Sequence, residues 1–169
     1  MKTKIDKKVM MMAAGAAAAV SLVLGILGIV SIYVPLLVCV TGPISCIIGY
    51  AVPAVAGGYA VKKHGVTKDN LVDGLLVGAI TGVATGVAAG VVGLVINLIS
   101  IPLYNAYYTS TLNSLDSSTS YLTTAAAVGG ATVVGAVIGL FVAVFFHVVI
   151  ASVSGLIVAA ITEHKGAAK

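Results

Sequence analysis

The sequence predicts an all-α fold, a polytopic membrane protein in which four transmembrane helices pack as one bundle. The chain of 169 residues is 60% hydrophobic and only 8% charged, whereas a soluble domain carries about 25% charged residues. Four apolar segments exceed the roughly 20 residues that an α-helix needs to cross the hydrocarbon core. Such a helix satisfies its own backbone hydrogen bonds, so lipid favours helices here.

The predicted helices leave little of the chain for any other domain. They cover residues 9–33, 36–61, 71–101 and 121–162, and residues 102–120 form an outer loop. The lysine-rich start followed by an apolar run is also typical of a secretory signal peptide. That run is too long and no small-residue cleavage site follows it, so we interpret it as the first transmembrane helix.

Lysine placement predicts the topology. All nine basic residues are lysines that cluster beside the ends of the apolar segments, and lysines are enriched in short cytoplasmic loops. The N-terminal cluster, the connection 62–70 and the tail after Glu163 are therefore expected in the cytoplasm, with residues 102–120 outside. The lysines thus indicate a protein of the cell membrane with both ends inside, rather than a nucleic-acid-binding protein.

The last apolar segment is the ambiguous one, because its length could hold two helices with a break at Gly129 and Gly130. Two spans would place the C-terminal lysines outside, and residues 125–160 contain no polar turn. We therefore predict one helix, and its excess length, like that of the third helix, predicts tilt or protrusion on the outer side. Five tyrosines gather near this predicted outer interface: Tyr33, Tyr104, Tyr107, Tyr108 and Tyr121. The helical spacing of Tyr104, Tyr108, Leu112 and Leu115 predicts a short interfacial helix in the outer loop.

The strongest pattern is a glycine zipper in the third helix. Helices in lipid associate through close backbone approach, which small residues four apart permit. The third helix has glycine at five such positions, and the fourth has a parallel row of small residues that includes three glycines. These packing glycines are Gly74, Gly78, Gly82, Gly86, Gly90, Gly135, Gly139 and Gly155. We predict that the two helices pack along these rows; the alternative is homo-oligomer formation through the same glycines.

One residue suggests chemistry inside the membrane. His147 is the only ionisable residue deep within an apolar segment, and such residues contact ions, protons or ligands. A polar path of His147, Asn97, Thr81 and Thr85 is one hypothesis. The alternative is a neutral imidazole hydrogen-bonded to one of these three residues or to a carbonyl.

No enzyme signature is present in the sequence. Paired carboxylates within the membrane, HExxH, CxxC and phosphate loops are all missing, so we predict no catalytic, cofactor-binding or metal-binding residues. Cys39 and Cys46 are interpreted as two small buried hydrophobes rather than as an intermolecular disulfide or metal site. A rotary-ATPase proteolipid would need a mid-membrane carboxylate, yet the fourth helix has none before Glu163.

Half of the chain resembles a known group of proteins. The PAVAGGYAV stretch that ends the second helix, the polar turn with Lys68 and Asp69, and the DGLLVGAITGVATG opening of the third helix carry this likeness. They resemble small, glycine-rich, four-helix membrane proteins of unknown function that are widespread in archaea. The resemblance implies an archaeal cell membrane and no established activity.

Two functional hypotheses follow from the sequence. The first is a non-enzymatic structural, accessory or oligomer-forming bundle, whose partners are the lipid bilayer and a second copy or another membrane protein. The second is a small channel or transporter for an ion or small solute, with His147 in the path. A pore requires polar residues that converge on a hydrated path, whereas a packing protein buries its glycine rows without water.

Overall fold

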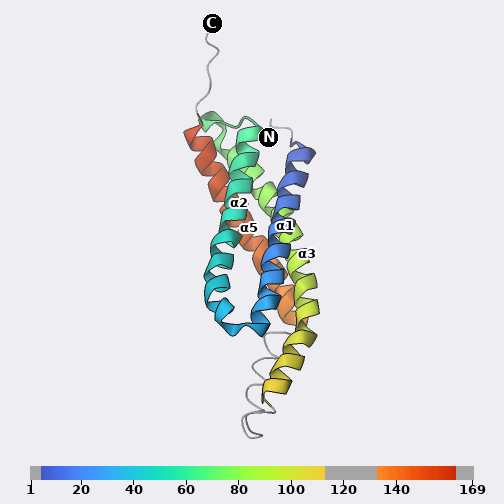
Figure 1. Ribbon diagram of the computed structural model, residues 1–169. Coiled ribbons are helices and arrows are strands. Elements are labelled where there is room, and N and C mark those ends of the chain that lie inside the picture. The colour runs from blue at the N-terminus through green and yellow to red at the C-terminus, as the bar shows by residue number, and fades with distance from the viewer. Residues whose placement is uncertain (1–4, 113–132, 163–169) are drawn as a thin grey trace.

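The computed structural model describes residues 5–112 and 133–162. Its helices form one elongated bundle (Figure 1), and 3₁₀ turns at Pro35–Leu37 and Lys68–Asn70 connect the first three of them. The helices are α1 (Lys7–Tyr33), α2 (Val38–Lys63), α3 (Leu71–Leu112) and α5 (Val133–Ile161). All four are long and apolar enough to cross a membrane. The prediction of an all-helical, four-helix bundle is confirmed for the described residues.

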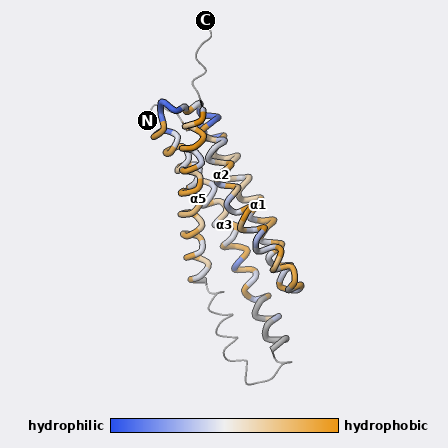
Figure 2. Tube along the Cα trace, turned by 90° about the vertical axis from the view of Figure 1, so that its left-hand side faces the viewer, coloured by the Kyte–Doolittle hydropathy of each residue, from blue (hydrophilic) through white to orange (hydrophobic). Residues whose placement is uncertain are grey.

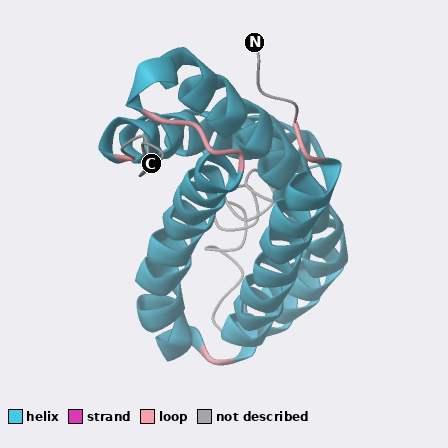
Figure 3. Ribbon diagram, turned by 90° about the horizontal axis from the view of Figure 1, so that it is seen from above, coloured by secondary structure: helices cyan, strands magenta, loops and turns pink. Residues whose placement is uncertain are grey.

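The bundle is organised around α3 and α5, which share its largest interface. The second largest is between α1 and α3, and α2 packs chiefly on α5. Although a tight turn joins α1 and α2 (Figure 3), these two helices share a smaller interface than α1 shares with α3 or α2 shares with α5. Every other helix therefore depends on the central pair for its position.

Hydrophilic residues gather at one end of the bundle (Figure 2), where the α2–α3 connection lies. The described lysines are Lys7, Lys8, Lys62, Lys63 and Lys68, in the first turn of α1, the last turn of α2 and the turn before α3. We call this end the lysine end, and the opposite end, with the Pro35–Leu37 turn, the turn end. Between them the outward side chains are apolar, as a lipid-facing surface requires.

A histidine joins the start of α1 to the end of α2 at the lysine end. His64 Nδ1 lies 2.7 Å from the Ala60 carbonyl oxygen, and the Asp6 backbone N–H donates to His64 Nε2 at 2.8 Å. A carbonyl only accepts, so Nδ1 carries the hydrogen and Nε2 is the acceptor. The Asp6 side chain in turn accepts from the Lys8 N–H at 2.9 Å and caps α1.

The third helix differs from the prediction at its far end, because α3 continues from Ile101 to Leu112 where the outer loop was expected. Pro102 removes one backbone donor within the helix but does not end it. The ring of Tyr107 packs edge-on against Tyr33, with 6.0 Å between ring centroids, which holds this extension against the end of α1. A separate interfacial helix starting near residue 104 is therefore not formed. Residues 121–132 of the predicted fourth helix lie outside the described residues.

We expect His64→Ala to lower the unfolding free energy by about 1–2 kcal/mol, because the Asp6 N–H loses its acceptor and the Ala60 carbonyl its side-chain donor. SDS-induced unfolding in mixed micelles, followed by circular dichroism, measures the difference. Lys63→Ala is the matched control, since Lys63 is an exposed neighbour on the same helix. Equal losses in both variants would contradict a joining role for His64.

Candidate functional site

The backbones of α3 and α5 approach each other closely over the lysine-end half of the bundle. A Cβ added to Gly78 would overlap the carbonyl oxygen of Ala151. A Cβ added to Gly82 would lie 2.5 Å from the Cα of Val148, and one added to Gly86 would lie 2.8 Å from the Cα of Val144. The α5 backbone therefore fills the space that any side chain at these positions would need. We call this contact the α3–α5 seam.

Two further glycines complete the seam at the lysine end. A Cβ on Gly74 would lie 2.7 Å from the Cβ of Ala159, and one on Gly155 would lie 2.6 Å from the carbonyl oxygen of Gly74. From the other side, α2 reaches α5 at Gly57, where an added Cβ would also overlap the Ala151 carbonyl oxygen. Ala151 is fully buried between glycines of two neighbouring helices.

The helices diverge toward the turn end, so the glycine row changes its role. At Gly90 the contact is looser, because an added Cβ would lie 3.2 Å from the side chain of Leu140 and 3.6 Å from its Cα. At Gly139 no described atom lies within 4 Å of such a Cβ, so the packing role predicted for Gly139 is not found in the described residues. Gly135, which was also predicted to pack, lines the open space left by this divergence.

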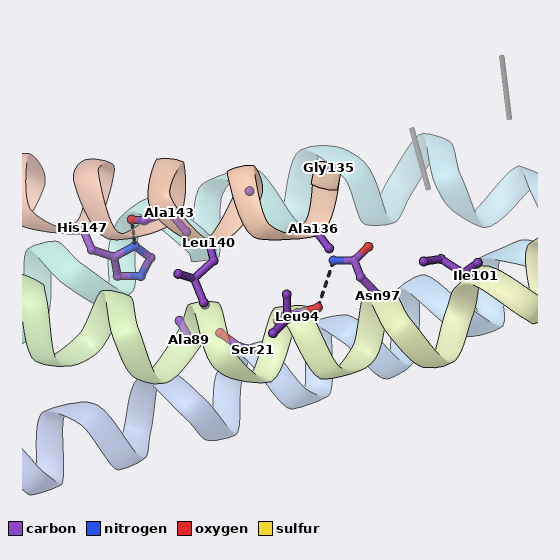
Figure 4. Close-up of a pocket in the computed structure, with 13 residues that line it drawn as sticks. Ser21, Ala89, Leu94, Asn97, Ile101, Gly135, Ala136, Leu140, Ala143 and His147 are labelled. Carbon is purple, nitrogen blue, oxygen red and sulfur yellow. Dashed lines mark hydrogen bonds between the residues drawn. The ribbon is translucent and has the colours of Figure 1, made fainter. Parts of the chain in front are cut away.

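That open space is a cavity of about 290 Å³ between α3, α5 and one residue of α1. Its polar side chains are Ser21, Asn97 and His147, and the rest of its wall is glycine, alanine, leucine and isoleucine (Figure 4). Within the part of the chain that the structure describes, no carboxylate or lysine lines it. We call this space the turn-end cavity.

His147 lies at the inner end of the turn-end cavity. Its Nδ1 is 2.8 Å from the Ala143 carbonyl oxygen on its own helix. A carbonyl only accepts, so Nδ1 carries a hydrogen, which in the Nδ1–H tautomer makes Nε2 the acceptor. Figure 4 shows the ring in the space between α5 and α3. Nε2 has no hydrogen-bond partner among the described residues. Every fully enclosed side-chain nitrogen or oxygen in those residues has a partner, so Nε2 is not enclosed and faces open space.

The structure separates the four residues of the predicted polar path. Thr81 and Thr85 are fully buried and donate to the carbonyl oxygens of Val77, at 2.7 Å, and Thr81, at 3.0 Å. Neither threonine lines the turn-end cavity. Asn97 does line it, together with His147, and its Nδ2 donates to the Gly93 carbonyl oxygen at 2.9 Å. The predicted path is therefore not continuous, because Thr81 and Thr85 are fully buried outside the cavity that Asn97 and His147 line.

Sequence reasoning did not assign Ser21 to a site. Its hydroxyl comes from α1 and lines both the turn-end cavity and a neighbouring hollow of about 240 Å³ that Asn97 shares. The only signal was its place in a row of small residues on α1, in which Ala13 and Ala17 are buried. Because that row faces α3, a serine in it is a polar group on a packed face.

The two cysteines differ from their interpretation as buried hydrophobes, because both are exposed on the surface of α2. In the turn-end half of α2, Gly42 and Gly49 have no described atom within 4 Å of an added Cβ. Within the described residues, no three histidine, cysteine or carboxylate side chains come together as a metal site would require.

Comparison with family models, curated proteins and solved structures finds no match to this chain. The resemblance to archaeal four-helix proteins stays a prediction.

We expect Gly82→Leu to destabilise the bundle by about 3 kcal/mol, because a side chain there must displace the α5 backbone. Gly93→Leu on the same helix is the matched control, since no described atom lies within 4 Å of its added Cβ. SDS-induced unfolding of both variants measures the contrast. Equal stability of the two variants would mean that α3 and α5 do not meet at Gly82.

Proposed function

We propose that this protein is a non-enzymatic accessory bundle of the cell membrane, with both termini in the cytoplasm. The observation that carries the proposal is the α3–α5 seam, where the backbone of one helix occupies the side-chain space of the other from Gly74 to Gly86. A seam without polar contacts between the two helices suits a protein that is held together in lipid and acts through its outer surface.

The lysine end supports the proposed orientation. The five described lysines lie in the first turn of α1, the last turn of α2 and the adjoining connection, and lysines accumulate in short cytoplasmic loops. At the turn end, the described helix ends and the Pro35–Leu37 turn carry no lysine. This asymmetry favours the cytoplasm for the lysine end.

The outward apolar surface of the bundle is the surface that a partner could meet. The glycine face of α3 is occupied by α5 within the same chain, so self-association through those glycines would require the bundle to open. Exposed apolar residues lie on the outward side of every helix, for example Met11 on α1, Ile47 on α2 and Phe141 on α5. A second copy, another membrane protein or lipid alone would meet this surface.

A small channel or transporter is the second candidate. His147 and Asn97 line one cavity, and His147 is the middle residue of α5 (Val133–Ile161). The seam continues from His147 to the lysine end, so conduction would require α3 and α5 to separate there. This function would therefore need a second conformation.

The orientation is tested with single cysteines in a Cys39→Ser, Cys46→Ser background. We expect a membrane-impermeant maleimide to label Val34→Cys on intact cells, because the turn end lies outside. Asn70→Cys, at the lysine end, should react only after the membrane is permeabilised. The reverse labelling pattern would overturn the proposed topology.

The accessory role is tested by native mass spectrometry in nanodiscs and by solute and proton flux in liposomes. We expect the protein to give no flux above that of empty liposomes. We also expect no oligomer that is lost in both Gly82→Leu and Gly86→Leu, because these glycines pack within one chain. A pH-dependent flux that His147→Ala removes would favour the transporter. A defined oligomer lost in both glycine variants would favour assembly through α3.

A further inference from the structure

The turn-end cavity contains acceptors that the protein itself does not satisfy. Nε2 of His147 faces open space with its lone pair, because the hydrogen is on Nδ1. The Ser21 hydroxyl makes no hydrogen bond within the described residues, in contrast to Thr81 and Thr85, which bond to their own helix. In the interior of a bilayer, where water is scarce, a polar group without a partner costs free energy. These groups favour a bound molecule that donates hydrogen bonds.

The lining of the cavity excludes charged ligands. Among the described residues that line it, neither a carboxylate nor a lysine is present to neutralise an ion, and an unpaired charge at membrane depth is costly. Most of the wall is aliphatic or glycine, which suits an apolar body with few polar groups. A volume of about 290 Å³ corresponds to about ten water molecules at about 30 Å³ each, so the ligand is small.

The cavity extends along the α3 and α5 helices. His147 lies opposite Gly86, while Asn97 lies eleven residues further along α3, which is about 16 Å at 1.5 Å per residue. Figure 4 shows His147 at one end, Asn97 toward the other, and Leu140 between them. A slot of this shape suits a chain-like molecule better than a fused-ring one.

We propose that the turn-end cavity binds a small, uncharged, chain-like alcohol, and that the ligand hydroxyl donates its hydrogen to Nε2 of His147. Ser21 lies at the same cavity and offers a further donor and acceptor, and the aliphatic wall contacts the chain. The site is independent of the accessory role proposed above. A chain lacking the hydroxyl fills the space without satisfying Nε2, so the site distinguishes an alcohol from the corresponding alkane.

The test uses octan-1-ol carrying a diazirine as a photoaffinity probe on the full chain in phosphatidylcholine nanodiscs. We expect labelling of cavity-lining residues in α3 and α5, with competition by octan-1-ol at least about tenfold more effective than by octane, as expected for one hydrogen bond. Octanoate and glycerol should compete weakly, because one is charged and the other lacks an apolar chain. Equal competition by octane, or stronger competition by octanoate or glycerol, would overturn the proposal.

Two variants separate the hydrogen bond from the space. His147→Phe keeps a ring but removes the acceptor, so the preference for octan-1-ol over octane should disappear. Gly139→Leu fills the cavity and should abolish labelling, whereas Gly15→Leu, at an exposed glycine of α1 with equally open surroundings, should leave it unchanged. Unchanged preference in His147→Phe, or equal labelling of both glycine variants, would contradict the site.

A spectroscopic measurement keeps His147 and the cavity lining unchanged and requires only that the other two histidines are replaced. In protein with ¹⁵N-labelled imidazoles and His64→Gln and His164→Gln substitutions, only His147 contributes signals. We expect one protonated nitrogen and one unprotonated nitrogen, and we expect octan-1-ol to shift the unprotonated one while octane does not. A signal that neither molecule moves, or that both move equally, would overturn the proposed contact.

Discussion

The contact between α3 and α5 is made by backbone against backbone, and the positions of the other helices follow from it. In lipid, apolar side chains gain little by leaving their surroundings, so helix association depends on close packing. Individual atom contacts contribute only about 0.1–0.2 kcal/mol each, and a close backbone approach multiplies their number. Ala151 shows the result, because its carbonyl oxygen lies against Gly78 of α3 and Gly57 of α2. The Ser154 hydroxyl, which donates to the Ala54 carbonyl oxygen at 2.6 Å, adds a directed bond between α5 and α2.

The same geometry explains why the cavity lies where it does. Helices that touch at the lysine end and diverge toward the turn end must leave space between them unless larger side chains fill it. Gly93 and Gly139 do not fill it, because each has no described neighbour within 4 Å of an added Cβ. Glycine therefore serves two opposite purposes on one helix pair. It permits contact near Gly82 and leaves open space near Gly139.

The polar residues also differ between the close contact of α3 with α5 and the turn-end cavity. Thr81 and Thr85 of α3 donate to carbonyl oxygens of their own helix and add no bond to α5, and the Thr81 hydroxyl also lies 3.5 Å from Met10 Sδ of α1. At the inner end of the cavity, His147 uses one ring nitrogen in the same way and presents the other to open space. An accessory bundle with a ligand site is compatible with this arrangement as it stands, whereas a conduit requires the seam to open.

The sequence by itself determined the helices of this protein and the residues that permit close approach. Apolar segments long enough to span a bilayer have only one local structure available in lipid, and glycine at every fourth position marks a face free of side chains. Only the tertiary structure decided which glycines are in contact, since a row of identical residues does not reveal where two helices begin to diverge. It also decided that α3 continues through Pro102, because the packing of Tyr107 on Tyr33 is a contact between distant segments. The grouping of Ser21, Asn97 and His147 around one cavity likewise depends on how three helices cross, and no local pattern encodes that relation.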